Sequence, residues 1–316
     1  MNSDGATAGV VVRVAVCVLT YRRPQGLARL LAALAALEVR PEVAVTVVVV
    51  DNDADGSGEP TVEAARQGLA YPLRYVVESS RSISIARNRA VREAGDAEFV
   101  AFIDDDEWPE PDWLNQLLDS RQQTGADIVA AGVLPVFASD PEAWVVQGGF
   151  FDRRRHDHNE AIRYATTSNV LIRRRCLEVV EGPFDEAFGL SGGEDTHLFA
   201  QLREAGCSIV WCDRAAVQEL IPDSRVSARW LLRREYRRGQ TLSLSLRARG
   251  TTPLLVVRRV GNGLGNLALG LVGTVAGLRQ GRAGVLSGVR RINFGAGMLT
   301  GLAGLRHLEY KKVHGG

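Results

Sequence analysis

The chain has 316 residues, of which 46% are hydrophobic, and this is enough to bury a large core in one large domain or two smaller ones. The net charge of +1 hides an asymmetry, because residues 222–316 hold 17 basic and 3 acidic residues, whereas residues 1–221 hold 21 basic and 34 acidic ones. A basic tail of this kind suits an anionic surface, either phospholipid or nucleic acid. The four cysteines form no Cys-x-x-Cys pair, which argues against a zinc site and favours a reduced, cytosolic chain.

The N-terminus lacks the features of a secretory signal. Its first residues carry no basic side chain, and the first apolar run is interrupted by Arg13, so this run is better interpreted as a strand. We expect residues 1–9 to form a disordered tail. No later stretch is an unambiguous membrane span.

Strand and helix patterns alternate in chain order. Runs rich in β-branched residues predict buried strands at 10–19, 43–50, 73–77 and 98–103, and helices are predicted after Pro24, near 61–69 and at 84–94. This order is typical of a parallel α/β sheet. A more irregular region, 125–190, precedes a helix predicted to begin at Glu194 and a further strand at 208–212.

Polar residues follow three of these predicted strands: Thr20-Tyr21-Arg22, Asp51-Asn52-Asp53, and Asp104-Asp105-Asp106-Glu107. In a parallel sheet the carboxyl ends of the strands meet at one edge, where ligands bind. No cationic residue follows the acidic cluster in sequence to offset its repulsion, so the cluster is either a solvated turn or the partner of an external cation. Convergence of the three strand ends favours Mg²⁺ or Mn²⁺ bound together with a diphosphate.

Five stretches carry a family resemblance. In chain order they are VAVCVLTYRRPQGLARLLAAL, VVVVDNDADG, SISIARNRAV, FIDDDEWPEPDWL and GGEDTHLFAQLREAG. Together they resemble the family 2 glycosyltransferases of GT-A fold, over about residues 10–220. The order is also similar to that of succinoglycan-type glucosyltransferases that extend lipid-linked oligosaccharides. The resemblance implies an α/β GT-A catalytic domain at 10–221, with a nucleotide-binding half (10–124) and an acceptor half (125–221) around a mostly parallel sheet.

The resemblance also implies roles for individual residues. The implied donor-binding residues are Thr20, Tyr21, Arg22, Asp51, Asp53, Arg81, Arg87, Asp104 and Asp105. Asn52 separates the two acids of the second strand end, so either Asp51 or Asp53 could contact the base. Asp106 is the implied ligand of Mg²⁺ or Mn²⁺, and Glu194 is implied to support the base or to contact the acceptor.

Asp195 is the candidate catalytic base. Glycosyl transfer with inversion needs one carboxylate to remove the proton from the acceptor hydroxyl, while a metal stabilises the departing diphosphate. A carboxylate in the first turn of a helix is kept ionised by the helix dipole. The alternative is an ordinary acid favoured at that position by the same dipole.

The basic tail, 222–316, is predicted to be a helical extension. Arginines recur every four residues from Arg225 to Arg237, interleaved with Trp230, which is typical of a basic amphipathic helix at an interface. The segment Val226-Ser227-Ala228-Arg229-Trp230 is similar to the QxxRW element of processive synthases, so Arg229 and Trp230 are candidate acceptor residues. Valine replaces the glutamine, which favours addition of a single sugar.

Residues 260–278 carry no charge but include six glycines and two asparagines, so they are a poor membrane span. We expect peripheral or monotopic attachment to an anionic membrane surface, the cytoplasmic face of the plasma membrane. The alternative is a soluble cytoplasmic protein in which two Gly-rich helices pack on the catalytic domain.

The predicted function is therefore inverting, divalent-metal-dependent transfer of one hexose from a nucleotide-diphospho-sugar to a lipid-linked saccharide or polysaccharide. UDP is the nucleotide expected in the donor. A sugar nucleotidyltransferase would carry a Gly-rich, Lys-bearing loop after the first strand, where this chain has LTYRRP. A nucleic-acid-binding protein would use the basic tail, but the acidic body and the scarcity of aromatic residues disfavour it, and no nucleic-acid partner is expected.

Overall fold

The computed structural model describes residues 11–190 and 192–305, so the tail predicted at 1–9 lies outside the described residues, as does the end of the extension from 306. The strands are β1 (Val12–Thr20), β2 (Val43–Asp51), β3 (Leu73–Val77), β4 (Phe99–Asp104), β5 (Glu107–Pro109), β6 (Ile128–Phe137), β7 (Asn169–Arg173) and β8 (Ile209–Ile221). The helices are α1 (Pro24–Ala35), α2 (Glu59–Ala65), α3 (Ile83–Glu93), α4 (Trp113–Thr124), α5 (Ala143–Gln147), α6 (Arg174–Glu178), α7 (Glu194–Glu204), α8 (Ala228–Ala248), α9 (Pro253–Gly277) and α10 (Gly281–Leu302).

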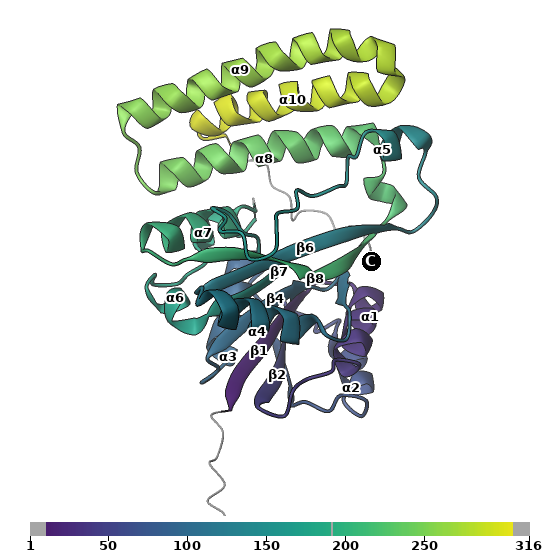
Figure 1. Ribbon diagram of the computed structural model, residues 1–316, viewed down its shortest axis with the longest axis vertical. Coiled ribbons are helices and arrows are strands. Elements are labelled where there is room, and N and C mark those ends of the chain that lie inside the picture. Colours follow the sequence, from purple (N-terminus) through teal and green to yellow (C-terminus); the bar gives the residue numbers. More distant parts are fainter. Residues whose placement is uncertain (1–10, 191, 306–316) are drawn as a thin grey trace, which may run out of the picture.

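The strands form one sheet in the order β3-β2-β1-β4-β7-β6-β8-β5 (Figure 1). Pairing is parallel among β3, β2, β1 and β4, as the sequence predicts, and also between β6 and β8. Strand β7 runs antiparallel to both of its neighbours, and β5 runs antiparallel to β8. The sheet is therefore parallel from β3 to β4 and mixed from β7 to β5.

The sheet is covered on both faces because its central strands are apolar along their whole length. Val47 to Val50 of β2 are all fully buried, which fits a strand with side chains packed on each side. On one face lies α1, which begins at Pro24 and buries four leucines in a single stripe: Leu27, Leu30, Leu31 and Leu34. Helix α3 covers the other face with its alanines.

The register brings the polar strand ends together. Thr20 at the end of β1 lies opposite Asp51 on β2, and Leu19 lies opposite Asp104 on β4. The predicted convergence of the first, second and fourth strand ends is therefore confirmed. The predicted strand at 208–212 is longer than expected, because β8 continues to Ile221 and pairs with the short strand β5.

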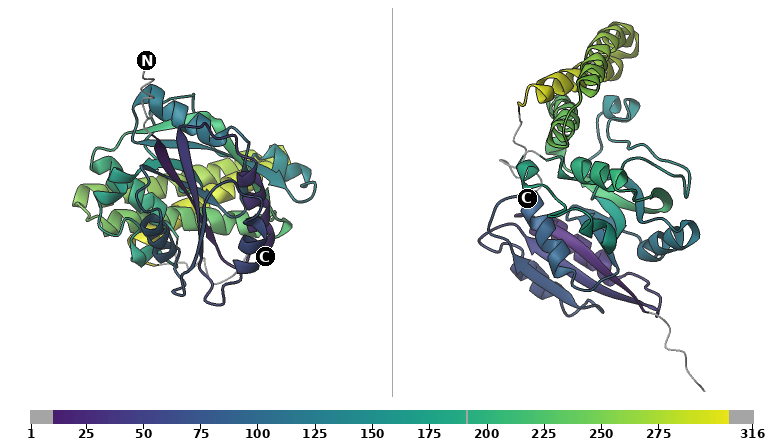
Figure 2. Two further views of the ribbon diagram at one scale, coloured as in Figure 1. Left: turned by 90° about the horizontal axis from the view of Figure 1, so that it is seen from below. Right: turned by 90° about the vertical axis from the view of Figure 1, so that its left-hand side faces the viewer.

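The extension folds as three helices stacked beyond one end of the sheet, with α8 nearest to the sheet, α10 next and α9 outermost (Figures 1 and 2). The helices approach closely because glycines lie at their crossings. A Cβ atom at Gly297 of α10 would overlap the carbonyl of Tyr236 on α8, and one at Gly277 of α9 would overlap the backbone of Gly284. No helix within residues 11–190 and 192–305 is both long and apolar enough to cross a bilayer.

Candidate active site

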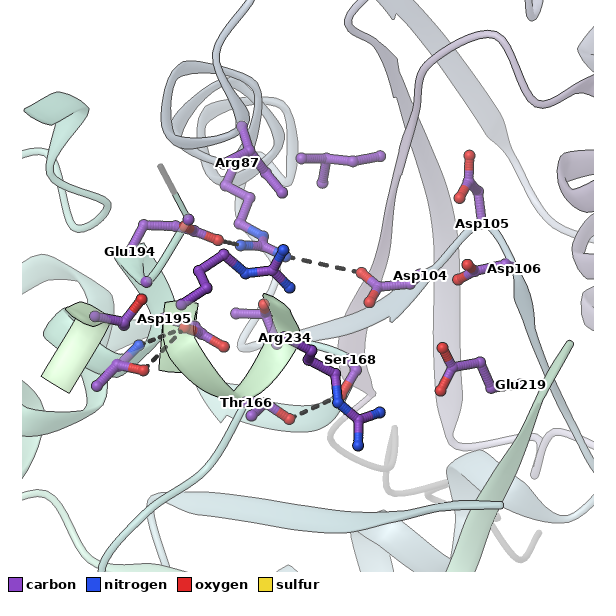
Figure 3. A pocket seen from close by; sticks show the side chains of 18 of the residues that line it. Arg87, Asp104, Asp105, Asp106, Thr166, Ser168, Glu194, Asp195, Glu219 and Arg234 are labelled. Atoms are coloured by element: carbon purple, nitrogen blue, oxygen red, sulfur yellow. Dashed lines mark hydrogen bonds and ion pairs between the residues drawn. The ribbon is translucent and has the colours of Figure 1, made fainter. Parts of the chain in front are cut away.

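A cavity of about 660 Å³ opens between the carboxyl ends of β1 and β4, the start of α7 and the inner face of α8. Figure 3 shows acids of β4 and α7 facing this cavity. Ten of the fourteen residues predicted from the sequence line it: Thr20, Tyr21, Arg81, Arg87, Asp104, Asp105, Asp106, Glu194, Asp195 and Trp230. The fold therefore assembles most of the predicted site, whereas the individual roles stay predictions.

The acidic cluster has cationic partners within the chain. Arg23 donates to Asp105 at 2.9 Å and to Asp106 at 3.2 Å, and Arg225 donates to Asp106 at 3.1 Å. Thr20 also donates to Asp105, at 2.9 Å. The expectation that the chain supplies no offsetting cation is wrong, because the fold brings in arginines that are 82 and 119 residues away in sequence.

These arginines do not fully balance the cluster. The pKa of Asp105 is raised to about 7, chiefly by burial and also by the neighbouring Asp106, although Arg23 acts in the opposite direction. Burial likewise raises the pKa of Glu107, which is 1% exposed, well above its usual range. The site therefore still favours the uptake of positive charge.

The donor set fits a hard divalent cation. The carboxylate of Asp106 faces the cavity with 20% of its side chain exposed, and carboxylate oxygens are the ligands that Mg²⁺ and Mn²⁺ prefer. Among the described residues the close three-ligand group is a different one, Asp127 with Cys176 and Cys207, and it lies outside the cavity lining. A site with one or two carboxylates leaves coordination positions of the metal vacant, and diphosphate oxygens of a substrate can fill them.

Two glycines set the entrance to α7, the helix that carries Asp195. Gly192 and Gly193 have φ values of +73° and +98°, which other residues rarely adopt. A Cβ atom at Gly193 would also overlap the side chain of Thr241 on α8. The chain can therefore turn sharply into α7 with Asp195 lining the cavity, and Oδ1 of Asp195 accepts hydrogen bonds from the backbone N–H and hydroxyl of Thr196.

Glu194 is not solvated but paired. Its carboxylate forms a buried ion pair with Arg87 of α3, and the guanidinium of Arg87 also lies 3.8 Å from Asp104 (Figure 3). Burial raises the pKa of Glu194 to about 7, more than Arg87 lowers it, and the adjacent Asp195 raises it as well. Arg87 thus connects the first turn of α7 to the end of β4.

Four predicted residues lie outside the cavity lining: Arg22, Asp51, Asp53 and Arg229. Asp51 is fully buried and accepts hydrogen bonds from the N–H of Gly58, the N–H of Asp53 and the hydroxyl of Tyr75. Asp53 is held by two hydrogen bonds from Arg22, at 2.9 and 3.0 Å. Both acids organise the turn after β2, and the choice between them as the residue that contacts the base stays a prediction.

The residue between them, Asn52, lines the cavity instead. Its amide donates to the carbonyls of Glu78 and Ser80, and its Oδ1 accepts from the N–H of Ser82. From the sequence, Asn52 is predicted only to separate the two acids. Its position at a strand end between two acids was the signal that could have identified it.

The far wall of the cavity comes from β8, α8 and the loop before β7. Glu219 of β8 lines the cavity and binds Arg153 and Arg225. Trp230 stacks on Phe151 with ring centroids 5.8 Å apart. Arg229 points elsewhere, into a small surface hollow that it shares with residues including Arg233. Three lining residues are not predicted as site residues from the sequence, because no local motif marks them: Arg153, Glu219 and Arg234 of α8.

Comparison with known proteins identifies the family. The family described as Glycosyl transferase family 2 matches residues 15–180. The succinoglycan biosynthesis protein ExoM of Rhizobium meliloti is 35% identical over 303 residues, which cover 92% of this chain and 93% of that protein.

Two solved structures share the fold. One is the mannosyltransferase PcManGT from Pyrobaculum calidifontis in complex with GDP-Man and Mn²⁺, with a TM-score of 0.62 and 19% identity over 92% of this chain and 87% of that one. The other is S. aureus TarS 1-349 in complex with UDP, with a TM-score of 0.51 and 15% identity over 93% of this chain and 92% of that one. They support the GT-A fold predicted from the motifs. This chain therefore belongs to the family 2 glycosyltransferases and is an enzyme of that class rather than a sugar nucleotidyltransferase.

Proposed function

We propose that this glycosyltransferase moves a single hexose from a UDP-sugar to a saccharide acceptor, with inversion at the anomeric carbon and with Mg²⁺ or Mn²⁺. The observation that carries the proposal is that the Asp104–Asp106 cluster and Asp195 line one cavity. The UDP bound to TarS and the GDP-Man and Mn²⁺ bound to PcManGT support the donor and metal classes.

Asp195 accepts the proton of the acceptor hydroxyl as that oxygen attacks the anomeric carbon. The new bond joins the acceptor oxygen to this carbon, and the bond to the diphosphate breaks on the opposite face, so the configuration inverts. Asp106 would hold the divalent metal, which would supply positive charge to stabilise the departing diphosphate. Arg81, which also lines the cavity, adds positive charge on the donor side, whereas the charge of Arg87 is shared with Glu194 and Asp104.

The acceptor is a lipid-linked saccharide of an exported polysaccharide. ExoM, which aligns along nearly the whole of this chain, is named for succinoglycan biosynthesis, and this supports the polysaccharide class. A lipid-linked acceptor requires the enzyme to work at a membrane, and the outer helix of the extension has a surface suited to one.

Apolar side chains on α9 and just beyond it face outward in a continuous stripe. These side chains are 54% to 76% exposed: Leu254, Val257, Leu264, Leu271, Val275 and Leu278. Successive members are three, four or seven residues apart, so they lie on one side of the helix. Residues 252–305 contain six arginines and no acid. An apolar face flanked only by cations matches an anionic phospholipid surface, on which such a helix lies flat. This supports peripheral attachment to the cytoplasmic face of the plasma membrane.

Two variants test the reaction. Asp195→Asn should retain Mn²⁺-dependent UDP affinity by calorimetry but lose transfer, whereas Asp106→Ala should lose the Mn²⁺ dependence of UDP binding. Asp140→Asn, which changes an exposed acid outside the cavity lining, is the matched control for both. Near-normal turnover of Asp195→Asn in a product assay would remove that residue as the base.

Vesicle sedimentation tests the attachment. The full chain should bind vesicles that contain phosphatidylglycerol, and Leu271→Gln/Val275→Gln should reduce that binding. If the wild type instead stays in the supernatant and elutes as a dimer that the double variant converts to monomer, the stripe is an interface between two copies and the membrane proposal is wrong.

A further inference from the structure

Charge is segregated within the cavity. Most of the lining acids come from the ends of β4 and α7, whereas the wall formed by α8 and the loop before β7 contributes arginines: Arg153, Arg234, Arg237 and Arg238. Glu219 of β8, which also lines the cavity, already binds Arg153 and Arg225. This wall, which we call the arginine wall, therefore presents several guanidinium groups to the cavity.

Arg234 is the central residue of the arginine wall. Its side chain is 23% exposed, its guanidinium lies 5.0 Å from the ring centre of Trp230 and 5.4 Å from that of Phe151, and one N–H donates to the carbonyl of Phe150. Its buried Nε has no hydrogen-bond partner among the described residues. The aromatic contacts fix the plane of the guanidinium, as cation–π packing does, at the edge of the cavity.

The carboxylate nearest to Arg234 is shared. Glu235 lies 3.8 Å from Arg234 but also pairs with Arg238 at 3.1 Å and with Arg290 at 2.7 Å. One acid thus serves three arginines. Burial, together with the neighbouring arginines, lowers the pKa of Arg234 to about 10, so this buried cation lacks sufficient compensation.

We propose that the arginine wall binds an anionic group of the acceptor, either a diphosphate or a sugar carboxylate. The inference rests on the proposed function, because the acceptor must reach Asp195. Helix α8 is suitably placed, since its Thr241 packs against Gly193 beside the first turn of α7, and Figure 3 shows Arg234 facing the same cavity as Asp195. The donor diphosphate has its own site at the β4 acids, so the two anions occupy opposite walls.

The anionic group could come from either of two kinds of acceptor, and three small-molecule probes distinguish between them. A lipid-linked acceptor carries a diphosphate, for which geranyl diphosphate is the probe, and an acidic sugar carries a carboxylate, for which methyl glucuronide is the probe. Methyl glucoside is the neutral comparison. Each is titrated by calorimetry into the full chain held in saturating UDP and Mn²⁺.

At least one anionic probe should bind, and more tightly than methyl glucoside. Arg234→Gln should weaken that binding about 10- to 100-fold, the loss expected for charge-assisted hydrogen bonds. Arg234→Lys keeps the charge but not the planar guanidinium, so it should recover part of the affinity for the anionic probe. Arg233→Gln removes the adjacent exposed arginine, which lies outside the cavity lining. It should change the affinity for the anionic probe less than twofold.

Binding of geranyl diphosphate alone would identify a phosphate-bearing acceptor, and binding of methyl glucuronide alone an acidic sugar. The inference is overturned if neither anion binds better than methyl glucoside, a comparison that needs only the wild type. The inference is also overturned if Arg234→Gln and Arg233→Gln change the affinity for the anionic probe to the same extent. Failure of the wild type to bind UDP with Mn²⁺ would instead refute the proposed function.

Discussion

Replacement of Arg87 by methionine tests how the base-bearing helix is held against the donor side. The Arg87 and Glu194 side chains are 6% and 4% exposed, so the variant leaves a buried carboxylate without its cation. Removing one partner of a buried pair costs about 3–5 kcal/mol. We expect a loss of unfolding free energy in this range at pH 8, because methionine fills a similar volume but supplies no charge.

The loss should depend on pH. In the wild type the pKa of Glu194 is raised from 4.5 to about 7, so the folded state binds more protons than the unfolded state between these values, and stability falls as the pH rises through this window. Without Arg87 the pKa of Glu194 in the folded state rises further. The pH range in which stability falls with rising pH then extends to higher pH. The difference between variant and wild type should therefore grow above pH 7, by at most about 1.4 kcal/mol per pH unit.

Urea unfolding at pH 6 and pH 8 measures both effects. The control is Arg89→Met on the same helix, since Arg89 is 34% exposed and pairs with Glu93 four residues along, an interaction of about 0.5 kcal/mol or less. A loss below about 1 kcal/mol for Arg87→Met at pH 8, or an equal loss at both pH values, would refute the argument from buried charge.

Three further changes follow from packing and backbone geometry. Gly193→Ala should cost about 1–3 kcal/mol in strain and reduce transfer, and adding Thr241→Ala should restore part of the stability by removing the overlapping side chain, as thermal unfolding would show. Leu31→Ala empties a fully buried position between α1 and the sheet and should cost about 2–5 kcal/mol in urea unfolding. Ser227→Ala removes the side chain that accepts the N–H of Trp230 at the start of α8, and calorimetric unfolding should report a loss of about 1 kcal/mol. Unchanged midpoints in any of these would contradict the contact concerned.

The first four strands and α1 could be predicted because their signal is local. A run such as 43–50 is apolar and β-branched throughout, and the leucines of α1 recur at helical spacing. Strand β5 has three residues and exists through its pairing with β8, more than a hundred residues later. No local pattern contains that information, and the same holds for the antiparallel direction of β7.

The same division applies to the site. Thr20 and the acids from Asp104 to Asp106 could be found because strand ends are visible in the sequence. Arg23 was visible too, within LTYRRP, but its pairing with Asp105 depends on how β1 and β4 lie side by side. Arg234 lies in a run of arginines on α8 with no local feature to distinguish it, and only the helix orientation separates it from Arg233.

The glycine crossings of the extension have a mechanical consequence. Where Gly297 meets Tyr236 and Gly277 meets Gly284, main chain touches main chain, so no rotamer change can absorb a small displacement. The three helices must then tilt together. A displacement of the outermost helix would therefore be passed through α10 to α8, and it would shift Trp230 and Arg234 relative to Asp195.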